Sequence, residues 1–122
     1  MKVFLDTSFI VSCIKRKIDF LSELKLNGLE AIVPNEVFEE LKDLSKSKKT
    51  SHEDRMSAKI GFDFLNSEKI KKVSLGSNVD EGLIKKGQLG LYIATLDNEI
   101  KRNVKNKVII SSSNNSIILQ RD

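Results

Sequence analysis

The chain of 122 residues has no tryptophan and only one cysteine, one proline, one tyrosine and one histidine. A single cysteine cannot form an internal disulfide, and because Cys13 lies in an apolar run we expect it to be a small buried hydrophobe. The chain also lacks an apolar run long enough for a membrane span, and the stretch after Met1 is too short for a signal peptide. We therefore expect a single globular domain, residues 1–122, located in the cytoplasm.

Charge of one sign is in modest excess. Lysine and arginine number 21 against 17 acidic residues, which gives a net charge of +4 and a pI near 9.2. This excess fits a polyanionic partner such as a nucleic acid. The polar and basic stretch at 46–51 is expected to be a loop, and the single histidine, His52, is expected to belong to this loop and to have a plain surface role.

Short apolar runs that predict strands alternate with segments that predict helices. Helices are expected after the capping residues Ser8, Asp19, Asn35, Asn78 and Asp97, and over 53–66, with Leu26, Met56 and Ile60 among the inward-facing residues. The strands are expected near 2–5, 31–33, 71–75, 91–94, 108–110 and 116–119. This alternation predicts a mainly parallel sheet with helices on both faces.

Two carboxylates directly follow predicted strands. Asp6 ends the first strand, and Asp97 follows Thr95 and Leu96 after the strand at 91–94. The carboxyl ends of parallel strands meet at the edge of the sheet where ligands bind. Ser8 and Thr95 lie beside these acids and are candidates to orient a carboxylate or a water.

Two further carboxylates lie on the apolar side of their predicted helices. At about 100° per residue, Glu40 lies roughly 60° from Val37, and Asp80 lies within about 10° of the mean direction of Leu83 and Ile84. Three of the four acids also have a simpler interpretation. Asp97 can be a helix cap, Asp80 a charge in the first turn of its helix, and Glu40 a half-exposed residue at the flank of its helix.

Converging carboxylates need a cation to stay ionised. Oxygen ligands without clustered cysteine or histidine favour Mg²⁺ or Mn²⁺ over zinc. The sequence therefore predicts a divalent metal site formed by Asp6, Glu40, Asp80 and Asp97.

Four motifs together resemble the PIN-domain family over nearly the whole chain: Leu5-Asp6-Thr7-Ser8, Val33–Leu41, Val79–Ile84 and Ala94–Asp97. The resemblance implies an α/β fold, a three-layer α/β/α sandwich with a central mainly parallel sheet. It also implies a Mg²⁺- or Mn²⁺-dependent endoribonuclease in which Asp6, Glu40, Asp80 and Asp97 are catalytic and metal-binding, with Ser8 and Thr95 supporting. Two departures are Leu96, where the family often has asparagine, and Gly82, which loosens its helix.

The chain resembles most the short archaeal rRNA-processing-type PIN proteins, with VapC-type toxins next. This implies RNA as a partner, and a homodimer, an antitoxin or a ribosome-assembly factor as further candidate partners, with no membrane involved. Few aromatic residues are available for base stacking, so we expect weak sequence readout. The residues that we expect to attract RNA are Lys46, Lys48, Lys49, Lys85, Lys86, Lys101 and Arg102.

Two other functions fit parts of the sequence. One is a catalytically weak PIN module for RNA binding or assembly. The other is a phosphoacceptor receiver domain, which needs an acidic pair after the first strand and an acceptor aspartate after a middle strand. Asp6 stands alone, and the run ending at Leu75 is followed by Gly76 and Ser77, so the receiver domain is disfavoured.

Overall fold

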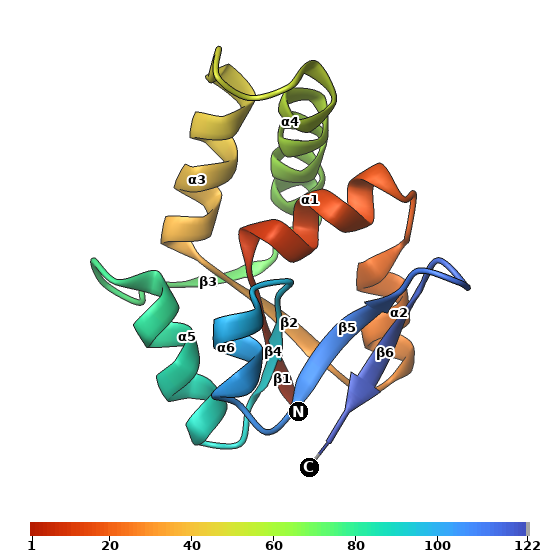
Figure 1. Cartoon of the computed structure of the whole chain (residues 1–122), viewed down its shortest axis with the longest axis vertical. Helices are drawn as coiled ribbons and strands as arrows, with labels where there is room; N and C mark the ends of the chain where they lie inside the picture. Colours follow the sequence, from red (N-terminus) through yellow and green to blue (C-terminus); the bar gives the residue numbers. More distant parts are fainter. Residues whose placement is uncertain (122) are drawn as a thin grey trace.

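A computed structural model describes residues 1–121, in which six strands form one sheet with the order β3-β2-β1-β4-β5-β6 (Figure 1). The first five strands are mutually parallel and β6 is antiparallel to β5. This confirms the predicted mainly parallel sheet. The strands are β1 Lys2–Leu5, β2 Glu30–Pro34, β3 Lys71–Val73, β4 Tyr92–Ala94, β5 Lys107–Ser111 and β6 Ser116–Gln120.

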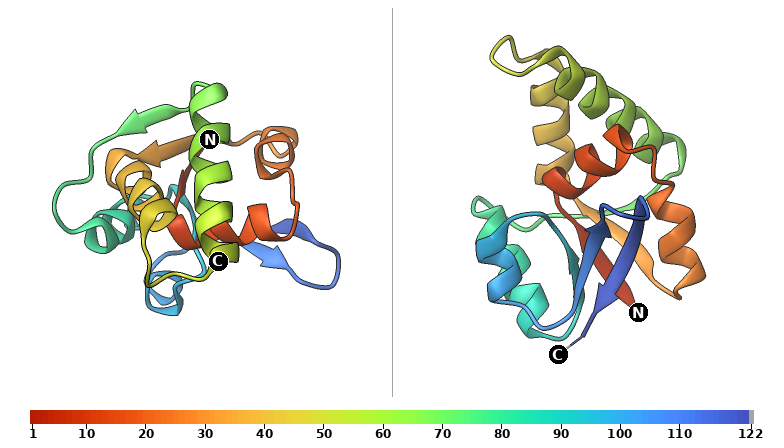
Figure 2. Two further views of the ribbon diagram at one scale, coloured as in Figure 1. Left: turned by 90° about the horizontal axis from the view of Figure 1, so that it is seen from above. Right: turned by 45° about the vertical axis from the view of Figure 1, so that its right-hand side comes forward.

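Helices cover both faces of the sheet, as Figure 1 shows for α5 and α6 on one side and α2 on the other. Neighbouring residues of β1 point to opposite faces, so Val3 and Leu5 pack with the helices of the larger core and Phe4 packs with those of the smaller one. Figure 2 shows that α3 and α4 form a hairpin that extends beyond the sheet and that α4 crosses α1. The helices are α1 Thr7–Lys15, α2 Phe20–Leu26, α3 Asn35–Lys46, α4 His52–Ser67, α5 Val79–Gln88 and α6 Asn98–Arg102.

The strand order places a crevice at the carboxyl end of β1. The chain adds β2 and then β3 on one side of β1, whereas β4 pairs on the other side. Such a change of direction leaves the strand ends uncovered by a crossover, and ligands bind at this point in open α/β sheets. The Asp6 backbone N–H donates to the Ala94 carbonyl at 2.9 Å, which ties the ends of β1 and β4 together.

Two predicted helix starts are wrong. The residue that caps α1 is Asp6, which accepts from the Thr7 backbone N–H at 2.9 Å, and Ser8 lies inside the first turn. Helix α3 begins at Asn35 itself, after Pro34, without any side-chain cap. Asp6 comes two residues before Ser8, and its carboxylate accepts from the first backbone N–H of the helix. Caps at Asp19, Asn78 and Asp97 are confirmed.

The predicted apolar faces of α2 and α4 are partly wrong. Leu26 is 86% exposed, and Met56 and Ile60 are 46% and 49% exposed. Three small residues, Ser57, Ala58 and Gly61, form the buried side of α4 together with Leu65. A Cβ at Gly61 would lie 3.0 Å from Ile10 Cγ2, so the close approach of α4 to α1 selects small side chains over large apolar ones.

Other expectations concern residues outside the site. Cys13 is fully buried as predicted, and burial raises the pKa of its thiol to about 12, so it has little thiolate character at neutral pH. His52 is exposed at the start of α4. Within residues 1–121, no helix combines the length and the apolar character that crossing a bilayer requires.

Candidate functional site

The four predicted acids line one cavity of about 360 Å³ at the carboxyl edge of the sheet. They reach it from four different elements, separated by up to 91 positions in the sequence. Ser8 and Thr7 line the same cavity, as does Leu96. The acids are Asp6 at the end of β1, Glu40 in α3, Asp80 in the first turn of α5 and Asp97 at the start of α6.

Asp6 is the least exposed acid of the four and has a hydrogen bond on each oxygen. Its Oδ1 accepts from the Thr7 backbone N–H at 2.9 Å, and its Oδ2 accepts from Thr95 Oγ1 at 2.7 Å. Burial raises the pKa of Asp6, the two hydrogen bonds partly offset this, and the charges of Glu40 and Asp80 raise it further. A cation in the cavity would stabilise the ionised form of Asp6.

Two hydroxyls hold the turn that carries Asp97. The buried Thr95 Oγ1 donates to Asp6 and accepts from the Asp97 backbone N–H at 3.1 Å. Ser8 Oγ accepts from the Leu96 backbone N–H at 3.1 Å and lies 3.5 Å from Thr95 Oγ1. The structure therefore places Ser8 and Thr95 beside Asp6, where they fix the position of the turn at 95–97.

Asp97 caps a helix and also faces the cavity. Its Oδ1 accepts from the backbone N–H groups of Glu99 at 2.8 Å and Ile100 at 3.3 Å, which is the geometry of an N-cap. The simpler interpretation of Asp97 is thus correct for Oδ1. Because the residue also lines the acidic cavity, capping does not exclude a second role for its carboxylate.

Glu36 is a residue of the cavity that the sequence interpretation missed. Its carboxylate accepts from Ser74 Oγ at 2.8 Å, and from the backbone N–H groups of Leu75 at 3.0 Å and Gly76 at 3.2 Å. The Leu75 bond is the main cause of a lowered pKa at Glu36. Glu36 lies one helical turn before Glu40 and clamps the loop that leads into α5. It therefore joins the helices that carry Glu40 and Asp80.

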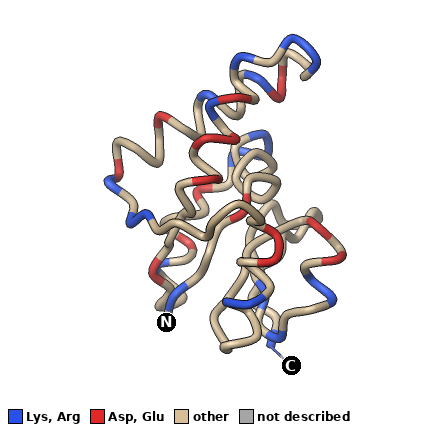
Figure 3. Tube along the Cα trace, turned by 90° about the vertical axis from the view of Figure 1, so that its left-hand side faces the viewer, with Lys and Arg blue, Asp and Glu red and all other residues tan. Residues whose placement is uncertain are grey.

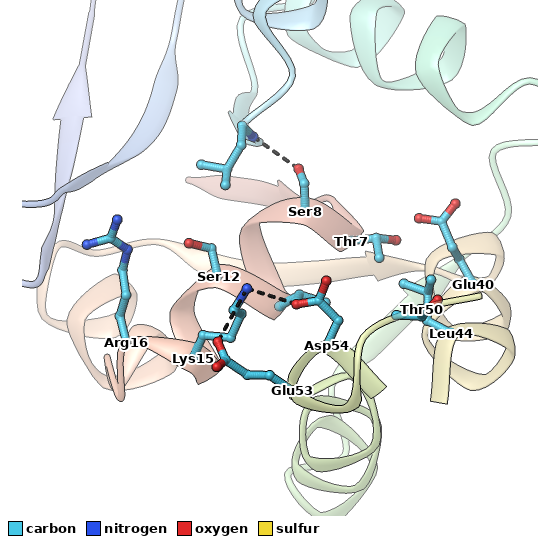
Figure 4. A pocket seen from close by; sticks show the side chains of 12 residues that line it. Thr7, Ser8, Ser12, Lys15, Arg16, Glu40, Leu44, Thr50, Glu53 and Asp54 are labelled. Carbon is cyan, nitrogen blue, oxygen red and sulfur yellow. Dashed lines mark hydrogen bonds and ion pairs between the residues drawn. The ribbon is translucent and has the colours of Figure 1, made fainter. Parts of the chain in front are cut away.

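The cavity fits a hydrated cation better than a bare one. No three carboxylate, imidazole or thiol groups of residues 1–121 lie close enough together to form a ready-made metal site. However, a cavity of about 360 Å³ has room for several waters, and Mg²⁺ usually keeps several of its waters. Thr7 Oγ1 is buried without a hydrogen-bond partner in the described chain, and its side chain points toward Glu40 (Figure 4). A bound water would satisfy it.

A second groove adjoins the acidic cavity along α1. Its volume is about 630 Å³, and it shares Thr7, Ser8, Glu40 and Leu96 with the acidic cavity. Lys15 lies in this groove, where its Nζ pairs with Asp54 at 2.8 Å and with Glu53 at 3.5 Å (Figure 4).

None of the predicted RNA-attracting cations lines the acidic cavity. No lysine or arginine of the described chain lines the acidic cavity. Figure 3 shows basic residues at the tip of the α3–α4 hairpin, where Lys46, Lys48 and Lys49 lie. On α5, Lys85 pairs with Glu81 at 3.4 Å and Lys86 Nζ lies 5.8 Å from the Phe4 ring centroid. Lys101 and Arg102 form the last turn of α6.

Together, the fold and the cavity define a three-layer α/β protein with a four-carboxylate site at the ends of parallel strands. The family profile described as "PIN like domain" matches residues 3–112, and the chain belongs to this family. PIN domains are generally nucleases that use divalent metals, although some are inactive. The predicted family and fold class are thus confirmed.

The solved structure titled "Structure of the PIN domain endonuclease Utp24" has the same fold. It matches with a TM-score of 0.75 and 18% sequence identity, over 99% of this chain and 92% of the other. No curated protein matches the chain significantly in sequence.

Proposed function

We propose that the protein is a Mg²⁺- or Mn²⁺-dependent endoribonuclease that hydrolyses RNA phosphodiester bonds. The observation that carries this proposal is the meeting of Asp6, Glu40, Asp80 and Asp97 in one cavity that no basic residue of 1–121 lines. The family and the endonuclease title of the similar structure support a nuclease.

The four carboxylates would hold one or two cations. A bound cation of this kind activates a water and stabilises charge on the scissile phosphate. Asp6 is oriented for this by Thr7 and Thr95, and the unpartnered hydroxyl of Thr7 is suited to hold a water. Ser8 fixes the turn before Asp97, and Glu36 fixes the loop before Asp80. Following the family, the products would be a 5′-phosphate and a 3′-hydroxyl.

The RNA substrate is proposed from charge and resemblance. No aromatic side chain of residues 1–121 lines the acidic cavity, so recognition of individual bases by stacking there is disfavoured. The two roles that the resemblance supports are rRNA processing and an RNase toxin. A homodimer, an antitoxin and a ribosome-assembly factor are the protein partners that go with these roles.

One observation favours a second candidate, a catalytically weak RNA-binding or assembly module. The carboxylates do not form a ready-made cluster in residues 1–121, so metal binding requires waters or side-chain movement. A calorimetric titration with Mn²⁺ separates the two candidates. Binding in the millimolar range or tighter supports the enzyme, and no binding in that range supports the module.

The direct test is to incubate pure protein with single-stranded and structured RNA in Mn²⁺. We expect cleavage by the wild-type protein, and a loss of at least about 100-fold in Asp6→Asn and Glu40→Gln, because both remove a proposed metal ligand. Glu39→Gln is the matched control, since Glu39 is an exposed neighbour on α3 that does not line the cavity. Cleavage that survives Asp6→Asn would overturn the assignment.

A further inference from the structure

A shallow groove between α6 and the β5–β6 hairpin is lined by three basic residues and, within the described part of the chain, by no acidic one. Its volume is about 510 Å³. The residues that line it are Asn98, Lys101, Arg102, Lys107, Ile109 and Gln120. Within residues 1–121, no ion pair joins any of its three cations to a carboxylate. Among the described residues, the lining of the groove therefore has a net positive charge.

The basic groove and the acidic cavity share no lining residue but are linked through the start of α6. Asp97 lines the acidic cavity, and the next residue, Asn98, lines the groove. Helix α6 then runs from Asn98 to Arg102, a distance of about 6 Å at a rise of 1.5 Å per residue. One polymer strand can therefore contact the acidic cavity and the basic groove at the same time.

The groove along α1, which also adjoins the acidic cavity, has the opposite character. Three carboxylates line it, those of Glu40, Glu53 and Asp54, against two cations, Lys15 and Arg16, so its lining has a net negative charge. Its Lys15 is already paired with two of them. A polyanionic strand that leaves the acidic cavity would meet negative charge along α1 and positive charge along α6. Electrostatics thus favours a path over α6.

The position of the cations is not explained by helix stability alone. Lys101 and Arg102 lie in the last turn of α6, where positive charge complements the helix dipole. Lys107, however, belongs to β5 and faces the same groove from the sheet. The lining residues include no aromatic side chain on which a base could stack. Such a surface suits phosphates, which position a strand without reading its sequence.

We propose that the groove of Lys101, Arg102 and Lys107 binds the phosphate backbone of the RNA strand next to the bond that is cleaved. This inference rests on the proposed ribonuclease function, and it places the path of the RNA strand over α6. Lys107 is assigned here as a contact that the sequence did not single out. The contact is independent of sequence and depends on salt, because each neutralised phosphate releases bound cations.

The test measures binding of a fluorescent single-stranded RNA by anisotropy in EDTA, so that no metal-dependent cleavage occurs. In Arg102→Gln/Lys107→Gln we expect the Kd to rise at least about tenfold. The negative slope of log K against log salt should become about 1.4 less steep for two lost contacts. The control, Lys2→Gln/Lys25→Gln, removes the same charge from exposed positions elsewhere. We expect its Kd to stay within about twofold.

Cleavage in Mn²⁺ then separates this inference from the proposed function. If wild-type protein cleaves RNA, the Arg102→Gln/Lys107→Gln variant should have a raised KM with kcat nearly unchanged, because neither residue reaches the acidic cavity. If both double variants lose the same affinity, the groove assignment is overturned even though cleavage stands. If the groove variant alone loses affinity but wild-type protein does not cleave, the groove stands and the enzyme assignment falls.

Discussion

Replacing Thr95 by valine removes one hydroxyl from the centre of the site and leaves the shape of the side chain nearly unchanged. Thr95 is 1% exposed, so the change is felt in the interior. Its hydroxyl donates to Asp6 Oδ2 at 2.7 Å and accepts from the Asp97 backbone N–H at 3.1 Å. The substitution therefore leaves a half-buried carboxylate without its side-chain donor and a backbone donor without its acceptor.

The expected loss of stability follows from these two bonds. A hydrogen bond to a charged group contributes about 1.5–3 kcal/mol and a neutral one about 1 kcal/mol. Because Asp6 is only partly buried, we take the lower end and expect Thr95→Val to lower the free energy of unfolding by about 2 kcal/mol at pH 7. For a chain of this length, this lowers the Tm by about 8 °C.

The loss should depend on pH. Burial raises the folded pKa of Asp6 above 3.8 and the Thr95 bond lowers it, so the variant has a still higher folded pKa. Below the unfolded pKa, Asp6 is protonated in both proteins and the penalty is smallest. As the pH rises through the folded pKa values, ionisation of Asp6 lowers the free energy of unfolding more in the variant than in wild-type protein. The difference between the two proteins therefore grows.

The assay is urea unfolding at pH 4 and pH 7 without metal, with Thr95→Ser as the control that keeps the hydroxyl. We expect the serine variant to retain the pH dependence of wild-type protein. Equal penalties for the valine and serine variants at pH 7, or a valine penalty that does not shrink toward pH 4, would refute the role given to the hydroxyl.

Three further predictions concern other contacts of the same fold. Glu36→Gln replaces one carboxylate oxygen that accepts from the loop at 74–76 by an amide donor, which should displace Asp80. We expect calorimetry to show an Mn²⁺ affinity about tenfold weaker, and an unchanged affinity would contradict this role of Glu36. Without metal at pH 7, Asp6→Asn should be more stable than wild-type protein, because it removes the cost of ionising Asp6, and this gain should shrink toward pH 4. At a Mn²⁺ concentration of 100 times the Kd, the metal should stabilise wild-type protein by about 2.7 kcal/mol and the variant far less. Gly87→Ala places a Cβ 2.2 Å from Val104 Cγ1, so thermal melting should show a loss of about 2–3 kcal/mol. Wild-type stability would mean that α5 and the segment after α6 move apart easily.

The acids of the site could be predicted because their positions follow from strand ends and helix periodicity. Asp6 and Asp97 each follow a short apolar run, and parallel strands bring such ends to one edge. Glu40 and Asp80 lie on the sides of their helices that face this edge. All four reach the same cavity in the structure, while their roles in metal binding stay a prediction.

The details that could not be predicted depend on contacts between distant segments. Glu36 has the sequence signature of an ordinary first-turn acid, but its partners are groups near Leu75, 39 positions away. The buried face of α4 is set by the closeness of α1, which favours Gly61 over the larger Ile60. The pairing of Lys15 with Asp54 likewise joins two elements that local periodicity treats separately.

The most direct test of the account is a crystal of the protein soaked in Mn²⁺ and measured for anomalous scattering. We expect a peak in the cavity between Asp6, Glu40, Asp80 and Asp97, where the ion is bound directly or through waters, and no such peak in a matched crystal of Asp6→Asn. A saturating soak that leaves this cavity without a peak, or a peak that persists in Asp6→Asn, would contradict the central claim that these four carboxylates form one metal site around Asp6.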